Sequence, residues 1–180
     1  MKKYQIIYAD PPWRYNFSKS NSREIENQYP TMSLEDICLL NVPSDDNAIL
    51  YLWATAPKLL EALQVMKSWG FEYKTHAIWD KEIIGMGYWF RGQHELLLVG
   101  VKGKMSPPPQ HLRVSSVRRE RRTKHSKKPS GVKIMIGEWF PELSKIELFA
   151  RKDDSKNLFN KNTCDSWDVW GNEVESDIEL

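Results

Sequence analysis

Residues 4–13 read YQIIYADPPW and decide where the first strand of the fold ends. The apolar run 4–9 predicts a buried strand, and the two prolines after Asp10 have no backbone N–H with which to continue a strand ladder. We therefore expect the strand to stop at Asp10. The order places a carboxylate at the carboxyl end of a strand, followed by a stiff turn and by the large ring of Trp13.

Strands and helices are expected to alternate along the rest of the chain. Apolar runs predict strands at residues 47–55, 72–80, 94–102 and 144–151, with a short return to the sheet at 167–173. Apolar spacing and capping residues predict helices within residues 31–43, 56–71 and 128–141. This alternation indicates an α/β protein with a parallel sheet covered on both faces. Ligands of such sheets bind beyond the carboxyl ends of the strands, where we expect Asp10, Asp80 and Arg151.

Length and composition limit the organisation of the chain. Its 180 residues, 41% of them hydrophobic, fit a single domain spanning residues 1–180. Cys38 and Cys164 have no C-x-x-C spacing and the four histidines are scattered, so we expect neither a disulfide framework nor a metal site. The first apolar run is too short for a signal peptide, and no segment reaches the length of a membrane span, which favours an intracellular protein.

Two connections carry residue types suited to contact with nucleic acid. Residues 81–93 are rich in glycine and aromatic side chains, and residues 103–127 form a long connection with three consecutive prolines. From Arg113 to Lys128 there are eight lysines or arginines and one acid, Glu120. A run of this kind is either solvated surface or a nucleic-acid contact, and composition alone leaves both interpretations open.

Seven blocks of the sequence resemble, in order, the MTA-seventy (MT-A70) family of adenine methyltransferases, and especially its short prokaryotic and phage members. The blocks read IIYADPPWRY, QYPTMSLEDICLLNVP, LYLWATAPKLLEAL, GMGYWFRGQHELLLVGVKG, HSKKP, KIELFAR and WDVWGNEV. The resemblance implies a Rossmann-like methyltransferase fold with a mostly parallel central sheet and helices on both faces. It also implies a permuted order, in which the catalytic DPPW motif precedes the main cofactor motif, and S-adenosylmethionine as the methyl donor.

The DPPW motif suits methyl transfer to the amino group of adenine. That nitrogen is a poor nucleophile because its lone pair is delocalised into the ring, and hydrogen-bond acceptors on both of its hydrogens would localise the pair. The carboxylate of Asp10 and the carbonyl of Pro11 are the expected acceptors, held in place by the stiff Pro11–Pro12 turn. Trp13 is expected to stack on the base. We assign these four residues as catalytic, and the reaction requires no metal ion and no strong general base.

The resemblance also implies five cofactor-binding residues: Asp10, Lys128, Glu147, Arg151 and Asn172. Asp10 would reach the amino group of the methionine moiety, and Lys128 would bind its carboxylate. Glu147 would bind the ribose or a neighbouring polar group, and Asn172 the ribose or the adenine. A solvated charge is the alternative for Lys128, and an ordinary ion pair beside a strand is the alternative for Glu147 and Arg151. Glu95 matches a family acid at the start of a strand, where a structural and a functional role are both open.

A base inside a duplex cannot reach such a pocket, so the target adenine must be unpaired or flipped out. Residues 14–31 would close over it, and residues near 89 and the basic run would hold the strand by stacking and phosphate contacts. The expected nucleic-acid contacts are Tyr29, Trp89, Arg91, Arg118, Arg119, Arg121 and Arg122.

We therefore expect an enzyme that methylates adenine N6 in DNA, encoded by a bacterium or phage, cytoplasmic, and monomeric or homodimeric. One alternative is the same chemistry on RNA. Another is a catalytically silent nucleic-acid-binding partner subunit, against which the intact DPPW motif argues. A nucleotide-binding protein of unrelated chemistry would need a glycine-rich phosphate loop, and the GMG at residues 85–87 is not one.

Overall fold

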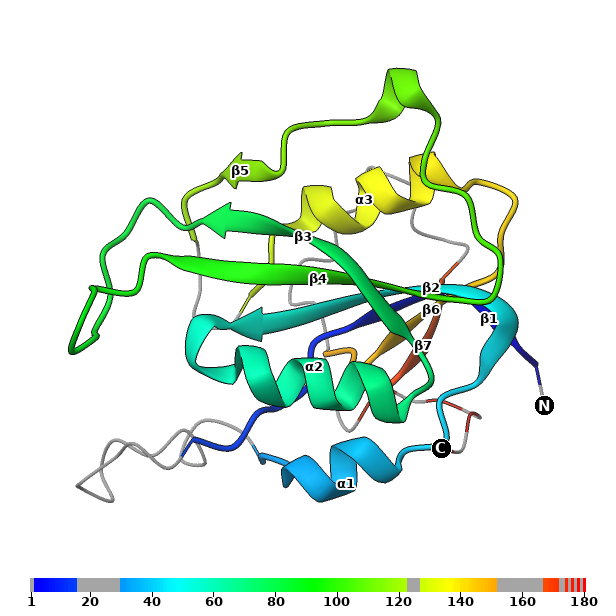
Figure 1. Cartoon of the computed structure of the whole chain (residues 1–180), viewed down its shortest axis with the longest axis horizontal. Helices are drawn as coiled ribbons and strands as arrows, with labels where there is room; N and C mark the ends of the chain where they lie inside the picture. The colour runs from blue at the N-terminus through cyan, green and yellow to red at the C-terminus, as the bar shows by residue number, and fades with distance from the viewer. Residues whose placement is uncertain are drawn as a thin grey trace.

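A seven-stranded sheet with helices on both faces forms the centre of the molecule (Figure 1). The structure, a computed structural model, describes residues 2–15, 30–122, 127–151, 167–171, 174, 176, 178 and 180. The strands are β1 (Tyr4–Ala9), β2 (Ser44–Thr55), β3 (Glu72–Asp80), β4 (His94–Lys102), β5 (Val117–Arg119), β6 (Lys145–Leu148) and β7 (Trp167–Trp170), in the order β5-β3-β4-β2-β1-β6-β7. The α-helices are α1 (Leu34–Leu39), α2 (Leu59–Ser68) and α3 (Ser130–Trp139), with 3-10 turns η3 (Ala56–Lys58) and η4 (Gln110–Leu112).

The sheet is mostly parallel, as the sequence predicted. Among the described strands only β4 runs antiparallel to its neighbours, β2 and β3. The cause is the connection 81–93, which folds back on itself as a hairpin, with the N–H of Lys81 donating to the carbonyl of Gln93 at 2.9 Å. The reversal brings the first residues of β4 to the edge where β2 and β3 end, so that Glu95 lies opposite Thr55 and Trp79.

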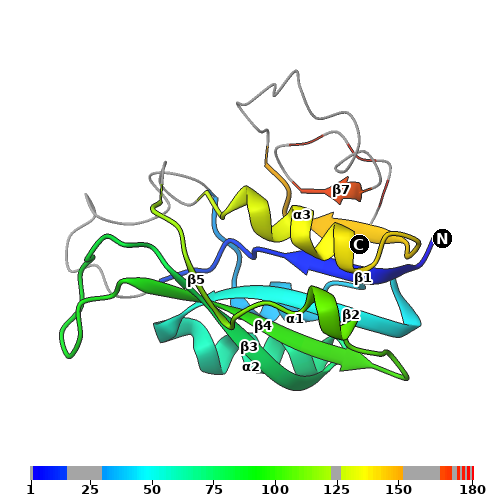
Figure 2. The same ribbon diagram turned by 90° about the horizontal axis from the view of Figure 1, so that it is seen from above.

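Alternate residues of β1 face different helices, as expected for a strand buried on both sides. Ile7 and Ala9 pack in the core beneath α1 and α2, whereas Ile6 and Tyr8 pack in the core beneath α3. Figure 2 shows the same layers from above, with α3 on one side of the sheet. The predicted buried strand is therefore confirmed, and its carboxyl end reaches the edge between two helical layers.

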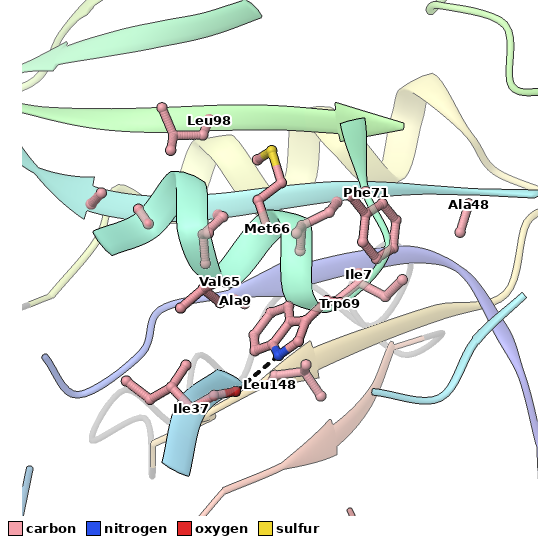
Figure 3. Packing of buried hydrophobic residues seen from close by; sticks show 14 of the residues in the cluster. Ile7, Ala9, Ile37, Ala48, Val65, Met66, Trp69, Phe71, Leu98 and Leu148 are labelled. Atoms are coloured by element: carbon pink, nitrogen blue, oxygen red, sulfur yellow. Dashed lines mark hydrogen bonds between the residues drawn. The ribbon is translucent and has the colours of Figure 1, made fainter. Parts of the chain in front are cut away.

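A buried hydrogen bond joins the end of α2 to α1. The indole N–H of Trp69, just after α2, donates to the carbonyl of Ile37 in α1 at 2.9 Å (Figure 3). The predicted cap of α1 is confirmed, because the side chain of Ser33 accepts the N–H of Asp36 and its hydroxyl donates to the Asp36 carboxylate. Gly70, at a φ of +83°, ends the α2 segment in the left-handed region.

The long basic connection contains a strand that the sequence did not predict. Residues 117–119 form the edge strand β5, parallel to β3, with Trp79 opposite Arg118. The indole N–H of Trp79 donates to the carbonyl of Glu120 at 2.7 Å and fixes the segment on the sheet. None of the helices in the described part of the chain is long and apolar enough to cross a membrane.

Candidate active site at the carboxyl edge of the sheet

Asp10 and Lys128 form an ion pair where β1 ends and α3 is about to begin. The Nζ of Lys128 lies 2.7 Å from Oδ2 of Asp10 and 3.4 Å from Oε2 of Glu95. It also lies 5.7 Å from the ring centroid of Trp53. The side chains of Asp10 and Lys128 are only 21% and 14% exposed, so the pair is largely shielded from water.

Charges alternate along this edge of the sheet. The Nζ of Lys81, directly after β3, lies 3.3 Å from Oε1 of Glu95, which completes the row Asp10, Lys128, Glu95, Lys81. Burial alone would lower the pKa of Lys128, but the carboxylates of Asp10 and Glu95 outweigh burial and raise it. Sequence analysis left the role of Glu95 open and did not identify Lys81 as a site residue. Both residues flank the hairpin between β3 and β4, and a predicted hairpin would have brought them together.

The DPPW turn is held by one backbone hydrogen bond within it and by one to the segment before α1. The carbonyl of Pro11 accepts the N–H of Trp13 at 2.8 Å, and the carbonyl of Pro12 accepts the N–H of Met32 at 2.9 Å. A carbonyl oxygen has two lone pairs, so Pro11 keeps one for a further donor. The turn is therefore held in one shape by the backbone that leads into α1.

Trp13 occupies a different place from the one we expected. Its ring is 4% exposed in the core beneath α1 and α2, and its indole N–H donates to the carbonyl of Trp53 at 3.2 Å. A ring enclosed in this way offers no free face to a base, so stacking by Trp13 is not supported. The short turn directs the ring back into the apolar core, next to the last residues of β2.

Glu147 and Arg151 lie on the neighbouring strand β6 and just beyond it. Glu147 is opposite Tyr8 of β1 and accepts a hydrogen bond from Lys133 of α3. This contact is an ion pair beside a strand, which was the alternative role that the sequence left open for Glu147. Between β6 and Arg151 the chain bends at Phe149, which has a φ of +61°, a conformation unusual for a side chain of this size. Lys133 was missed by sequence reasoning, because only the docking of α3 brings it to Glu147.

The expected substrate residues that the structure describes are mostly at the surface. Trp89 is 95% exposed on the hairpin 81–93, and Arg91 on the same hairpin donates through Nε to the carbonyl of Gly85 at 2.7 Å. Tyr29 and Asn172 lie outside the described residues. So does most of the 14–31 segment that we expect to cover the base.

The basic run is less uniform than its sequence suggests. Arg118 is half-buried and paired with Glu120 at 3.0 Å, whereas Arg119 is exposed and lies 3.7 Å from Asp80. Arg121 is exposed as well. Within the described residues, no three His, Cys, Asp or Glu side chains gather as they would around a metal ion.

These features define an α/β protein with a cluster of charged side chains at the carboxyl end of a central strand, the edge at which such folds bind ligands. The family model described as MT-A70 matches residues 4–173. The chain belongs to the MT-A70 family.

Named relatives fall into two groups of different length. The chain is 38% identical over 201 aligned residues to the type II methyltransferase M.MunI of a Mycoplasma species, covering 99% of this chain and 82% of that protein. It is 30% identical over 183 residues to an N(6)-adenosine-methyltransferase MT-A70-like protein of Drosophila melanogaster, and 29% identical over 160 residues to one of Arabidopsis thaliana. The chain spans only 27% and 22% of these two eukaryotic proteins.

Proposed function

We propose that this chain transfers a methyl group from S-adenosylmethionine to the N6 amino group of adenine in DNA. Membership of the MT-A70 family and the names of both groups of relatives support methyl transfer to adenine. M.MunI, which the chain matches over 82% of that protein's length, is named a type II methyltransferase, and this name favours DNA as the substrate. The observation that carries the proposal is the ion pair between Asp10, which begins the stiff turn after β1, and Lys128, which precedes α3.

The charges at this edge fit the methionine part of the cofactor. That part carries an ammonium group and a carboxylate, the complements of Asp10 and Lys128 respectively. A bound zwitterion can therefore replace each member of the ion pair by a partner of the same charge. Glu95 lies 3.4 Å from the Nζ of Lys128 and favours its charged form, so Lys128 keeps a carboxylate partner during the exchange. When bound, S-adenosylmethionine supplies an electrophilic methyl group.

The DPPW turn positions the acceptor base. Asp10 and the free lone pair of the Pro11 carbonyl accept the two amino hydrogens of adenine, which localises the lone pair on N6. Pro12 and Trp13 hold the turn, through the bonds to Met32 and Trp53. The rate gain comes from orientation and from preorganised acceptors in a shielded site.

The remaining assigned residues complete the cofactor site. Glu147 binds the ribose hydroxyls, with Lys133 holding its carboxylate in place, and Arg151 lies at the rim beyond the bend at Phe149. Asn172 and Tyr29 are proposed for the cofactor and the target base on the family resemblance. We further infer the permuted order of this fold, supported by the position of β1 between β2 and β6.

The DNA strand lies over the basic edge, with the adenine flipped or unpaired. Arg118, Arg119, Arg121 and Arg122 contact phosphates, and Trp89 and Arg91 contact the strand from the hairpin. The protein acts in the cytoplasm as a monomer or homodimer. RNA is the second candidate substrate, favoured by the names of the eukaryotic relatives.

One experiment separates these substrates. The protein is incubated with labelled S-adenosylmethionine and with DNA or RNA oligonucleotides of matched sequence pools, and the nucleosides are identified by mass spectrometry. We expect N6-methyladenine in DNA, and none with Asp10→Asn. Product in RNA alone would favour the second candidate, and product in neither would overturn the proposal.

A further inference from the structure

The hairpin between β3 and β4 presents an unusual apolar surface to solvent. Tyr88, Trp89 and Phe90 are 94%, 95% and 90% exposed, and Ile84 and Met86 are 66% and 81% exposed. We call residues 84–90 the aromatic tip. Single exposed apolar residues are ordinary, but five on one short loop indicate an interaction surface for a ligand or a macromolecule.

The backbone of the aromatic tip is preformed. The N–H of Gly85 donates to the carbonyl of Gly92 at 2.9 Å, and the N–H of Gly92 donates to the carbonyl of Met86 at 3.0 Å. A Cβ at Gly87 would lie 2.0 Å from the carbonyl oxygen of Phe90, so the close turn requires glycine there. The rings are thus displayed on a closed turn, which lowers the entropy lost when they are buried by a ligand.

The base of this hairpin is anchored to the proposed active site. Gln93 donates through Nε2 to Oδ1 of Asp80 at 2.8 Å, and Lys81 is paired with Glu95, which in turn contacts Lys128. The hydrogen bond from Gln93 and that from the backbone of Glu82 lower the pKa of Asp80. Figures 1 and 2 both show the hairpin projecting beyond the edge of the sheet at which β1 ends.

Arginines lie beside the base of the aromatic tip, and we call Arg91, Arg121 and Arg122 the cationic flank. The N–H of Arg122 donates to the carbonyl of Lys81 at 3.3 Å, and the N–H of Glu120 donates to the carbonyl of Asp80 at 3.1 Å. These bonds fasten the basic run beside the hairpin, with exposed Arg121 between them and Arg91 on the hairpin itself. Large exposed rings beside arginines fit a ligand with stacked aromatic bases and phosphates on its outside.

We propose that the aromatic tip inserts into the base stack of duplex DNA and fills the gap left by the flipped target adenine. The inference rests on the proposed function and names the form of its substrate: a base-paired duplex rather than a single strand. Inserted aromatic side chains replace the stacking that the neighbouring bases lose when the adenine leaves. The cationic flank contacts neighbouring phosphates, and the short link to Asp80 and Glu95 aligns the gap with the catalytic turn.

Unwinding of plasmid DNA tests insertion without any methyl transfer. Closed circular plasmid is relaxed by topoisomerase I in the presence of the protein, and the linking number is measured after the protein is removed. The wild-type protein should lower the linking number in proportion to the amount bound, because insertion between bases unwinds the helix. The variant Tyr88→Ser/Trp89→Ser/Phe90→Ser should not. The control Leu39→Ser/Leu60→Ser removes apolar side chains that are 81% and 80% exposed on α1 and α2, and should unwind like wild type.

Methylation of the same plasmid after linearisation, either native or heat-denatured and rapidly cooled, tests whether insertion serves to free the adenine from a duplex. The triple variant should lose at least about tenfold in rate on native plasmid and less than about threefold on denatured plasmid, where no base must leave a duplex. Equal losses on both forms, or unwinding by the triple variant, would overturn the inference. So would a lower sedimentation coefficient for the triple variant, which would make the tip a contact between copies of the chain. If wild type methylates neither form, the proposed function fails, while the unwinding result still decides the role of the tip.

Discussion

The Nζ of Lys128 lies 2.7 Å from Oδ2 of Asp10, although 118 positions separate the two residues in the sequence. Asp10 ends the first strand and Lys128 precedes the last described helix, so the pair closes the edge of the sheet between β1 and α3. Both charges are largely shielded, and each is the complement of one end of an amino-acid zwitterion. We therefore expect cofactor binding to break the ion pair, with Asp10 binding the ammonium group of the cofactor and Lys128 its carboxylate.

Replacing Lys128 by alanine should weaken the binding of S-adenosylmethionine by about 1–3 kcal/mol, the range for a hydrogen bond to a charged group. The matched control is Lys67→Ala, which removes an exposed lysine from α2. Isothermal titration calorimetry with the cofactor or its product gives the dissociation constants. An unchanged constant for Lys128→Ala would return this lysine to a structural ion pair.

Replacing Asp10 by asparagine or alanine should reduce methyl transfer by at least about 100-fold, the effect of losing one preorganised group at a reacting centre. The fold should remain cooperative, because the carboxylate lies at the rim of the sheet and Lys128 keeps Glu95 as a partner. Single-turnover methylation and thermal unfolding measure the two effects. Near wild-type turnover in a folded variant would exclude the proposed catalytic turn.

Local signals were enough to predict most of the elements around this site. The prolines after Asp10 end β1, and the cap at Ser33 and the left-handed Gly70 delimit the helices, all within a few residues of sequence. The ranges 72–80 and 94–102 were predicted to the residue, because turn-forming and apolar segments alternate sharply there. Such features depend on backbone chemistry that a short window of sequence contains.

Pairings between distant segments could not be predicted in this way. Whether Trp13 faces a ligand or the core depends on the space left at the end of β2, which only packing determines. Lys81 and Glu95 meet because β4 returns antiparallel, and Lys133 meets Glu147 because α3 crosses β6. The sequence shows which residues are charged, but it does not show which partner folding brings to each of them.

The buried position of Trp13 gives a prediction about stability. Trp13→Ala should lower the free energy of unfolding by about 3–5 kcal/mol, the cost of emptying a large aromatic site in a core. Trp13→Phe should cost less, since it keeps most of the ring and loses the hydrogen bond to the carbonyl of Trp53. Urea denaturation measures both values. A Trp13→Ala protein as stable as wild type would contradict the core assignment and restore base stacking.

The raised pKa of Lys128 predicts a loss of stability at alkaline pH. The native state holds this proton more tightly than the unfolded chain, whose lysines titrate near 10.5, so the stabilisation is complete below that pH. It is lost as pH rises through the native pKa. The free energy of unfolding should therefore fall more steeply above pH 10.5 in wild type than in Lys128→Met.

Other groups do not obscure this comparison. Burial raises the pKa of Tyr8 and Tyr51 as well, so both proteins lose stability at alkaline pH from these tyrosines. The difference between the two curves isolates the lysine. Parallel curves would show that Asp10 and Glu95 do not hold the proton on Lys128.

The exposed arginines beside the hairpin predict how DNA binding depends on salt. Arg119 is the last residue of β5, Arg121 lies two residues beyond it, and both are exposed. If each contacts one phosphate, each contributes about 0.9 to the slope of log affinity against log salt concentration. Arg119→Ser/Arg121→Ser should therefore flatten that slope by about 1.8 and weaken binding at low salt.

Replacing Arg118 and Arg122 as well should flatten the slope further, but it would also remove the partner of Glu120, which is paired with Arg118. Binding of a labelled duplex oligonucleotide at four salt concentrations gives the slopes, with Lys67→Ser as the control and S-adenosylmethionine affinity as the check that the site is intact. Parallel slopes for wild type and the double variant would mean that these arginines do not touch the DNA backbone.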